Sequence, residues 1–241
     1  YMEMRRQVGQ VYWMCGFHSP KYLQEENGAM ELLAIILGQG FNSRLNLKVR
    51  EEKGLVDEII ASASDFDENT MFNIFMKTDT KRLKDAEKAV MAEIFALASH
   101  RVTQSELLRA RSIIQNNILF LHDDIRQEVG FKSIVEIRTG SFLNCDKYLN
   151  DILALNSEDI LKIAKEYLRP DNISVCTIIP EKDSFEKRDS EDLIPSIKEA
   201  LQIAEETTYQ SDEQVLLEGK SLTLLFPEGK PLDKIKEFNL S

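Results

Sequence analysis

Three histidines are the side chains in this sequence best suited to hold a catalytic metal ion. A zinc site on a helix needs two imidazoles about one turn apart, because both ring nitrogens must reach the same ion. His18, His100 and His122 lie far apart. None is followed by a glutamate three residues later and a second histidine four residues later. The sequence therefore predicts no metal site and no catalytic residue within this chain.

Other residue patterns that support catalysis are also missing from the sequence. Cys15, Cys145 and Cys176 are odd in number and widely spaced, which argues against a disulfide framework or a zinc knuckle and favours buried thiols. Gly38 and Gly40 follow an expected helix rather than a strand, so they do not form a phosphate-binding loop. No Ser-His-Asp or Cys-His arrangement is supported by the spacing.

The stretch from residue 36 to residue 55 has a local structural explanation. Gly38 and Gly40 can adopt the positive φ angles that end one helix and start another at a sharp angle. Asn42 or Ser43 can cap the second helix, because a side-chain oxygen accepts hydrogen bonds from the first N–H groups of a helix. We therefore expect a helix, a glycine turn, and a short second helix that carries paired arginines and ends at another glycine.

The order of residues in this stretch also resembles the second-domain signature of the M16 metallopeptidases. This is the family of insulin-degrading enzymes, mitochondrial processing peptidases and their bacterial relatives. The signature looks like L-G-x-G-x-x-S-R-L, four further residues, and then R-E-x-x-G-L. Ten positions agree over nineteen residues, namely Leu37, Gly38, Gly40, Ser43, Arg44, Leu45, Arg50, Glu51, Gly54 and Leu55.

The resemblance implies a peptidase family, whereas the residues imply a part of it that cannot cut peptides alone. M16 enzymes bind zinc through H-x-x-E-H on a helix and a more distant glutamate. This chain contains no such motif. The resemblance therefore implies zinc in a larger parent protein, which would also bind the peptide substrates, and no cofactor in this chain.

Arg50 is the candidate substrate-binding residue. In M16 halves that bind substrate, an arginine and a tyrosine seven residues later hydrogen-bond to the peptide backbone, and Arg50 matches the arginine. Asp57 stands where the tyrosine would be, and an ionised carboxylate repels the oxyanion that a phenol could stabilise. This departure favours a second-domain placement. The alternative is that Arg50 forms a salt bridge or cap on a short helix, and Arg44 is expected to fix the turn.

The composition is that of an ordinary globular protein with an acidic balance. The net charge of −11 argues against nucleic acid as a partner, because nucleic-acid binding needs a basic surface. No apolar run approaches the ~18–20 residues that span a bilayer. No signal-peptide pattern follows Arg5 and Arg6. Nothing in the sequence indicates the compartment.

Apolar periodicity predicts an α+β fold. The expected sheet is mostly antiparallel, with one face covered by a block of helices, as in M16 peptidase domains. Strands are expected over residues 8–17, 56–66, 71–78 and 173–179. Helices are expected over residues 22–37, 81–98, 103–121, 125–138, 146–153 and 156–168. The helix over 81–98 has its apolar positions at 83, 86, 90, 94 and 97. A capping box of Thr103 and Glu106 opens the helix over 103–121.

Two segments are predicted along the chain. Residues 1–180 form the M16 non-zinc α+β domain, and residues 181–241 form an acidic, partly ordered linker or tail that leads toward a following domain. Within this tail we expect a short helix over residues 194–203 and a short strand over residues 221–226.

These observations predict a non-catalytic domain of an M16-type zinc metalloendopeptidase. It would support the zinc domain and form part of the chamber that encloses peptides. The alternative is an M16-like scaffold or assembly protein without peptidase activity, and an unrelated α+β interaction module is a third possibility. The expected partners are other M16 domains of the same chain or of a homo-oligomer, with no membrane span.

Overall fold

A five-stranded sheet forms the centre of the protein. The computed structural model of the chain describes residues 1–20, 25–66, 69–183 and 185–209. The strands are β1 (Met2–Arg6), β2 (Val11–Ser19), β3 (Glu58–Phe66), β4 (Asn69–Thr78) and β5 (Ile173–Pro180). They lie in the order β1-β5-β2-β4-β3, with β1 parallel to β5 and all other neighbours antiparallel. The predicted α+β class and mostly antiparallel sheet are therefore confirmed.

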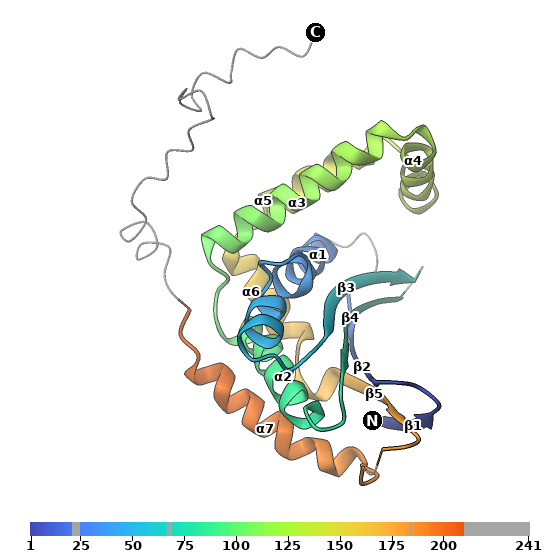
Figure 1. The fold of residues 1–241 in the computed structure, drawn as a ribbon. Helices are drawn as coiled ribbons and strands as arrows, with labels where there is room; N and C mark the ends of the chain where they lie inside the picture. Colours follow the sequence, from blue (N-terminus) through green and yellow to red (C-terminus); the bar gives the residue numbers. More distant parts are fainter. Residues whose placement is uncertain (21–24, 67–68, 184, 210–241) are drawn as a thin grey trace, which may run out of the picture. The chain divides into compact units, whose positions relative to one another are not determined.

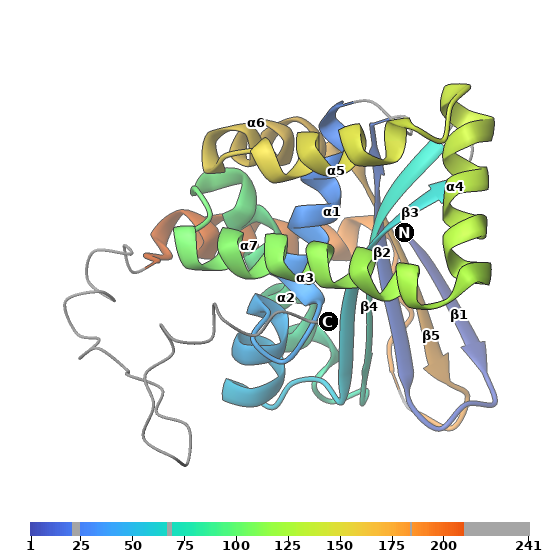
Figure 2. The same ribbon diagram turned by 90° about the horizontal axis from the view of Figure 1, so that it is seen from above.

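The helices gather on one side of this sheet (Figure 1). The α-helices are α1 (Glu25–Gly38), α2 (Leu83–Ser99), α3 (Gln104–Asp123), α4 (Ile125–Thr139), α5 (Asn144–Ala154), α6 (Ser157–Tyr167) and α7 (Ser190–Glu206). The shorter elements are a π-helical segment, η1 (Asn46–Glu52), and a 3₁₀ turn, η2 (Pro170–Asn172). Helices α1 and α6 contact the sheet, and α3 crosses over α1 (Figure 2). None of the helices within the described ranges is long and apolar enough to cross a bilayer.

Local sequence explains where α3 begins and which side of α2 is buried. Helix α3 begins with the predicted capping box, in which Thr103 and Glu106 each accept a hydrogen bond from the other's backbone N–H. Helix α2 buries the five apolar positions that the periodicity indicated, which are Leu83, Ala86, Val90, Ile94 and Leu97.

The two faces of the sheet differ in burial. Trp13 on β2 and Ile74 on β4 are fully buried beneath the helices. On the opposite face, one cross-strand row runs through all five strands and contains Met2, Cys176, Met14, Phe75 and Ile60. Met2, Met14 and Ile60 on this row are 58%, 42% and 46% exposed. We call this second surface the open face.

Helix α7 extends the compact unit beyond the boundary expected at residue 180. The unit runs from Tyr1 to Thr207, and α7 packs on α2 through buried Leu193 and Ala200. The helix begins four residues earlier and ends three later than the 194–203 segment expected from apolar positions. Its first turn is polar and is set by a capping box at Asp189, so apolar periodicity alone missed it. The strand predicted over residues 221–226 lies outside the described residues.

Candidate functional site

The turn after α1 is built on close contact between helix and sheet. Gly38 lies against β3 so closely that a Cβ atom there would sit 2.3 Å from the backbone nitrogen of Ala61. Any larger residue would push the helix end away from the strand. Gly40 then adopts a φ of +81°, which only glycine takes up readily. Gly38 therefore allows the close contact between α1 and β3, and Gly40 allows the turn that follows.

The polar side chains after Gly40 hold the turn closed. The Ser43 hydroxyl donates to the Gly40 carbonyl at 2.8 Å. The Asn46 amide donates to the same carbonyl at 3.2 Å and to the Ser43 oxygen at 2.9 Å. The expectation that Ser43 caps the second helix was therefore wrong, because its hydroxyl binds the preceding carbonyl instead.

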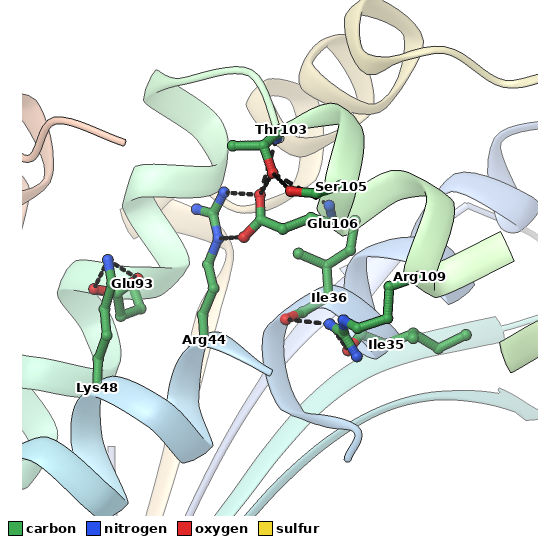
Figure 3. Close-up of polar contacts among 9 residues, drawn as sticks. All are labelled: Ile35, Ile36, Arg44, Lys48, Glu93, Thr103, Ser105, Glu106 and Arg109. Carbon is green, nitrogen blue, oxygen red and sulfur yellow. Dashed lines mark hydrogen bonds and ion pairs between the residues drawn. The ribbon is translucent and has the colours of Figure 1, made fainter. Parts of the chain in front are cut away.

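Arg44 is buried and ties this turn to α3. Its Nε and a terminal nitrogen donate to the two carboxylate oxygens of Glu106 at 2.6 and 2.8 Å (Figure 3). Burial alone would raise the pKa of Glu106, but the Arg44 guanidinium and the Thr103 N–H and hydroxyl more than offset this and hold the pKa below its ordinary value. The predicted role of Arg44 in fixing the turn matches this geometry.

Two further cationic side chains, Arg109 and Lys48, stabilise the same region. Arg109 on α3 donates to the carbonyl oxygens of Ile35 and Ile36 at the end of α1 (Figure 3). It also donates to the carbonyl oxygen of Gln39, just after the helix. Lys48 on η1 pairs with Glu93 on α2 at 2.9 Å. Sequence analysis did not single out Arg109, Lys48 or Glu93, because nothing local marks a contact with a distant element.

Arg50 lies on η1 with 39% of its side chain exposed, and its Nε is 3.9 Å from Glu51. Asp57 stands at the position of the family's tyrosine. Its carboxylate accepts from Gln10 at 2.6 Å and lies 3.2 Å from Arg82. A distance of 3.9 Å between Arg50 and Glu51 is too long for a strong salt bridge, so this pair alone does not account for a role of Arg50. A π-helical segment is a rare geometry that is frequent at functional sites.

The residues considered for metal or thiol chemistry are not gathered at one place. In the part of the chain that the structure describes, no group of three His, Cys, Asp or Glu side chains could hold a metal ion. His18 is exposed, and His100 binds the Ala204 carbonyl at 2.8 Å. The His122 side chain lies outside the described residues.

The expectation of buried thiols holds for one cysteine. Cys15 is fully buried, and this burial raises the pKa of its thiol. Cys145 and Cys176 are partly exposed, so the expectation was wrong for them. Cys145 lies at the start of α5, and Cys176 lies on the open face. The spacing of cysteines along the chain does not show how exposed these two places are.

Comparison with known families agrees with this architecture. The family model described as "Peptidase M16 inactive domain" matches residues 2–114. Over this segment the chain is similar to the inactive domain of M16 peptidases. The matched segment includes the whole glycine turn, η1 and the Arg44–Glu106 pair.

Curated relatives of this chain are named as zinc proteases. An uncharacterized zinc protease of Streptomyces coelicolor is 26% identical over 185 residues, which are 76% of this chain and 40% of that protein. The uncharacterized zinc protease YmxG of Bacillus subtilis is 20% identical over 69% of this chain and 41% of that protein. The chain thus spans about two-fifths of the length of these curated relatives.

Solved structures share the fold of this chain. A protease from Helicobacter pylori matches with a TM-score of 0.69 and 16% identity, over 74% of this chain and 44% of that one. The inactive peptidase domain of a zinc protease from Bordetella parapertussis matches with a TM-score of 0.66 and 20% identity, over 76% of this chain and 97% of that one. At these identities the likeness establishes the fold.

Proposed function

We propose that this chain is the non-catalytic domain of an M16-type zinc metalloendopeptidase, in which it supports the zinc domain and forms part of a peptide-enclosing chamber. The observation that carries the proposal is the open face of the sheet. A lone domain rarely leaves a contiguous apolar surface in water, and such a surface marks a place where another part of the protein packs.

One row of the open face is apolar and partly exposed, and it lies beside the Lys77–Glu58 ion pair. Met14 and Ile60 project from the middle and the edge of the sheet and are 42% and 46% exposed. Phe75 lies between them on β4, in register with both. Apolar area of this kind gains roughly 25 cal/mol per Å² when it is buried. The remaining three-fifths of the relatives' length would supply the covering domain.

Zinc belongs to the proposed parent protein rather than to this chain. The relatives are named zinc proteases, and a catalytic zinc site needs three protein ligands around an open position. The described side chains of this chain do not gather such a set. In the proposed arrangement, zinc held by another domain would supply the activated water for peptide hydrolysis, and this domain would orient the zinc domain and enclose the substrate.

Arg50 is the residue through which this domain would touch the peptide. Its side chain is partly exposed, and Glu51 is its one charged partner within the described residues, at 3.9 Å. A guanidinium presents several N–H donors to backbone carbonyls. Asp57 is occupied by Gln10 and Arg82, so Arg50 would act without a neighbouring phenol.

The test uses the full-length native polypeptide, purified without chelators. Metal analysis should find one zinc per zinc domain, and cleavage of unstructured peptides should be abolished by chelation and restored by zinc. Met14→Glu should lower kcat/KM about tenfold or more, because a charge buried at a domain contact is costly. Ile194→Glu on α7, where Ile194 is 47% exposed, is the matched control and should leave activity unchanged.

Two outcomes would contradict the proposal. A folded full-length protein that holds no zinc and cuts no peptide would favour the scaffold alternative. If Met14→Glu and Ile194→Glu behaved alike, the open face would not be the surface that supports the zinc domain.

A further inference from the structure

A hollow of about 360 Å³ lies on the open face of the sheet, and sulfur-containing side chains gather around it. Met2, Met14, Met71 and Cys176 are among its described lining residues. Three of the seven methionines and one of the three cysteines in the sequence therefore meet at one place. Three of the other methionines are buried in the core, where they serve as ordinary apolar side chains.

Strand pairing places three of these side chains next to one another. Met2 on β1 and Met14 on β2 are both paired with Cys176, which lies between them on β5. Paired residues of neighbouring strands point to the same face of a sheet, with Cβ atoms about 5 Å apart. The two thioethers therefore flank the thiol. Both methionines are exposed and Cys176 is partly exposed, so an ion from solvent can reach all three.

Gly16 makes room for the fourth sulfur atom. It lies two residues after Met14 on β2 and so belongs to the same face of the sheet. A Cβ atom at Gly16 would lie 3.2 Å from the sulfur of Met71, which shows that the Met71 thioether lies over the glycine backbone. A methionine side chain is unbranched and has several rotatable bonds, so its sulfur can move toward a shared ligand.

The ligand types select a soft metal ion. Thioether and thiolate sulfurs suit Cu(I), whereas zinc sites are built from cysteine, histidine and carboxylate ligands. The lining residues that the structure describes include no histidine, aspartate or glutamate, and Cys176 is their one zinc-type ligand. Charge balance agrees with Cu(I), because one thiolate neutralises one monovalent cation and leaves no net charge on an apolar surface.

We propose that Met2, Met14, Met71 and Cys176 bind one Cu(I) ion. The Cys176 sulfur would form a Cu–S bond while its thiol proton passes to solvent, and the three thioethers would complete the coordination. Copper remains Cu(I), so no electron is transferred. Local spacing does not predict this set, because its four members come from four different strands.

This inference goes beyond the proposed peptidase role and does not rest on it. All four ligands belong to this chain, and the measurement is copper binding rather than peptide cleavage. Met14→Leu removes a thioether but keeps an apolar side chain of similar size, whereas Met14→Glu, which tests the domain contact, places a charge on the surface. Either proposal can therefore fail while the other stands.

The experiment titrates the 241-residue chain with Cu(I) in competition with bicinchoninate, a chelator that is coloured when it holds Cu(I). Oxygen is excluded, and ascorbate keeps the copper reduced. One Cu(I) per chain should move from the chelator to the protein, and an equal concentration of Zn(II) should not displace it. X-ray absorption at the copper edge should show sulfur ligands.

Substitutions locate the bound ion. Met14→Leu should weaken Cu(I) binding about tenfold and Cys176→Ser about 100-fold, the range over which changes around metal sites alter affinity. Cys145→Ser is the matched control. Cys145 is also a partly exposed thiol, but the described residues that line the hollow beside it include no methionine. Its substitution should leave the affinity unchanged.

Three results would overturn the proposal. The first is a native chain that takes no Cu(I) from the chelator. The second is an equal loss of affinity in Cys145→Ser and Cys176→Ser, which would show thiol binding without a site. The third is an unchanged affinity in Met14→Leu, which would exclude the thioethers as ligands even if Cys176→Ser failed to fold.

Discussion

Arg44 and Glu106 are 62 residues apart in the chain and bind each other through two hydrogen bonds of 2.6 and 2.8 Å. Their side chains are only 3% and 19% exposed. The pair joins the turn after α1 to the first turn of α3, and Glu106 also completes the cap with Thr103. Arg44, an arginine of the M16-like signature, is thus a structural element that joins the turn to α3.

Arg44→Ala should lower the free energy of unfolding by about 3 kcal/mol, because it leaves the Glu106 carboxylate buried without its cation. Urea unfolding followed by circular dichroism measures this change. Arg169→Ala is the control, since Arg169 pairs with Asp171 at 3.5 Å on the surface and should contribute less than about 1 kcal/mol. Equal effects of the two substitutions would show that the buried pair is not important for stability.

The same pair predicts a pH dependence. The pKa of Glu106 is lower in the folded protein than its ordinary value of 4.5. A lowered folded pKa contributes stability that is present above the ordinary value and is lost as the pH falls through the folded value. The difference in unfolding free energy between the native chain and an Arg44→Met/Glu106→Gln variant should therefore shift against the native chain below about pH 4.5. A difference that stays constant from pH 7 to pH 3 would contradict this.

Gly38→Ala should destabilise the fold by about 2 kcal/mol or more, because the new methyl group would lie against the backbone of Ala61. Gly9→Ala is the matched control. A Cβ atom at Gly9 meets nothing within 4 Å, so this change should stay within about 0.5 kcal/mol. Thermal unfolding of both variants provides the comparison, and similar melting temperatures would rule out the close contact.

Arg188 should hold α7 on the domain. Its guanidinium donates to both oxygens of the fully buried Glu87 at 2.6 and 2.9 Å and lies 5.1 Å from the ring centre of Phe185. Arg188→Ala should destabilise the protein by about 3–5 kcal/mol and speed amide exchange along α7. Lys88→Ala, which removes an exposed pair with Glu199, is the control. Unchanged exchange along α7 in the Arg188 variant would refute this role.

Substitution of Arg50 distinguishes a substrate-binding role of this residue from a structural one. In the full-length protein, Arg50→Ala should lower kcat/KM for peptides about tenfold, as expected for a lost hydrogen bond from a charged group. Its melting temperature should stay within the equivalent of about 0.5 kcal/mol, because the side chain is partly exposed. A loss of stability with unchanged kcat/KM would instead support the salt-bridge or capping alternative.

Local sequence determined the types and order of most elements. Apolar periodicity identified the buried side of α2 and the strand that carries Trp13, and the Thr103–Glu106 spacing identified the start of α3. These patterns can be recognised because neighbouring residues share one helix face or one sheet face. The short edge strand β1 was missed, since half-exposed charged and apolar residues there lack a clear alternation.

Tertiary structure alone decided which charges meet and which surfaces stay uncovered. The partners of Arg44 and Arg188 lie 62 and 101 residues away, and no local pattern encodes such distances. The same is true of a cavity lined by residues of α1, α3, α4 and α5, which are distant from one another in the chain. Sequence periodicity specifies how a segment folds against its neighbours in the chain, whereas long-range ion pairs and cavities depend on how whole elements pack.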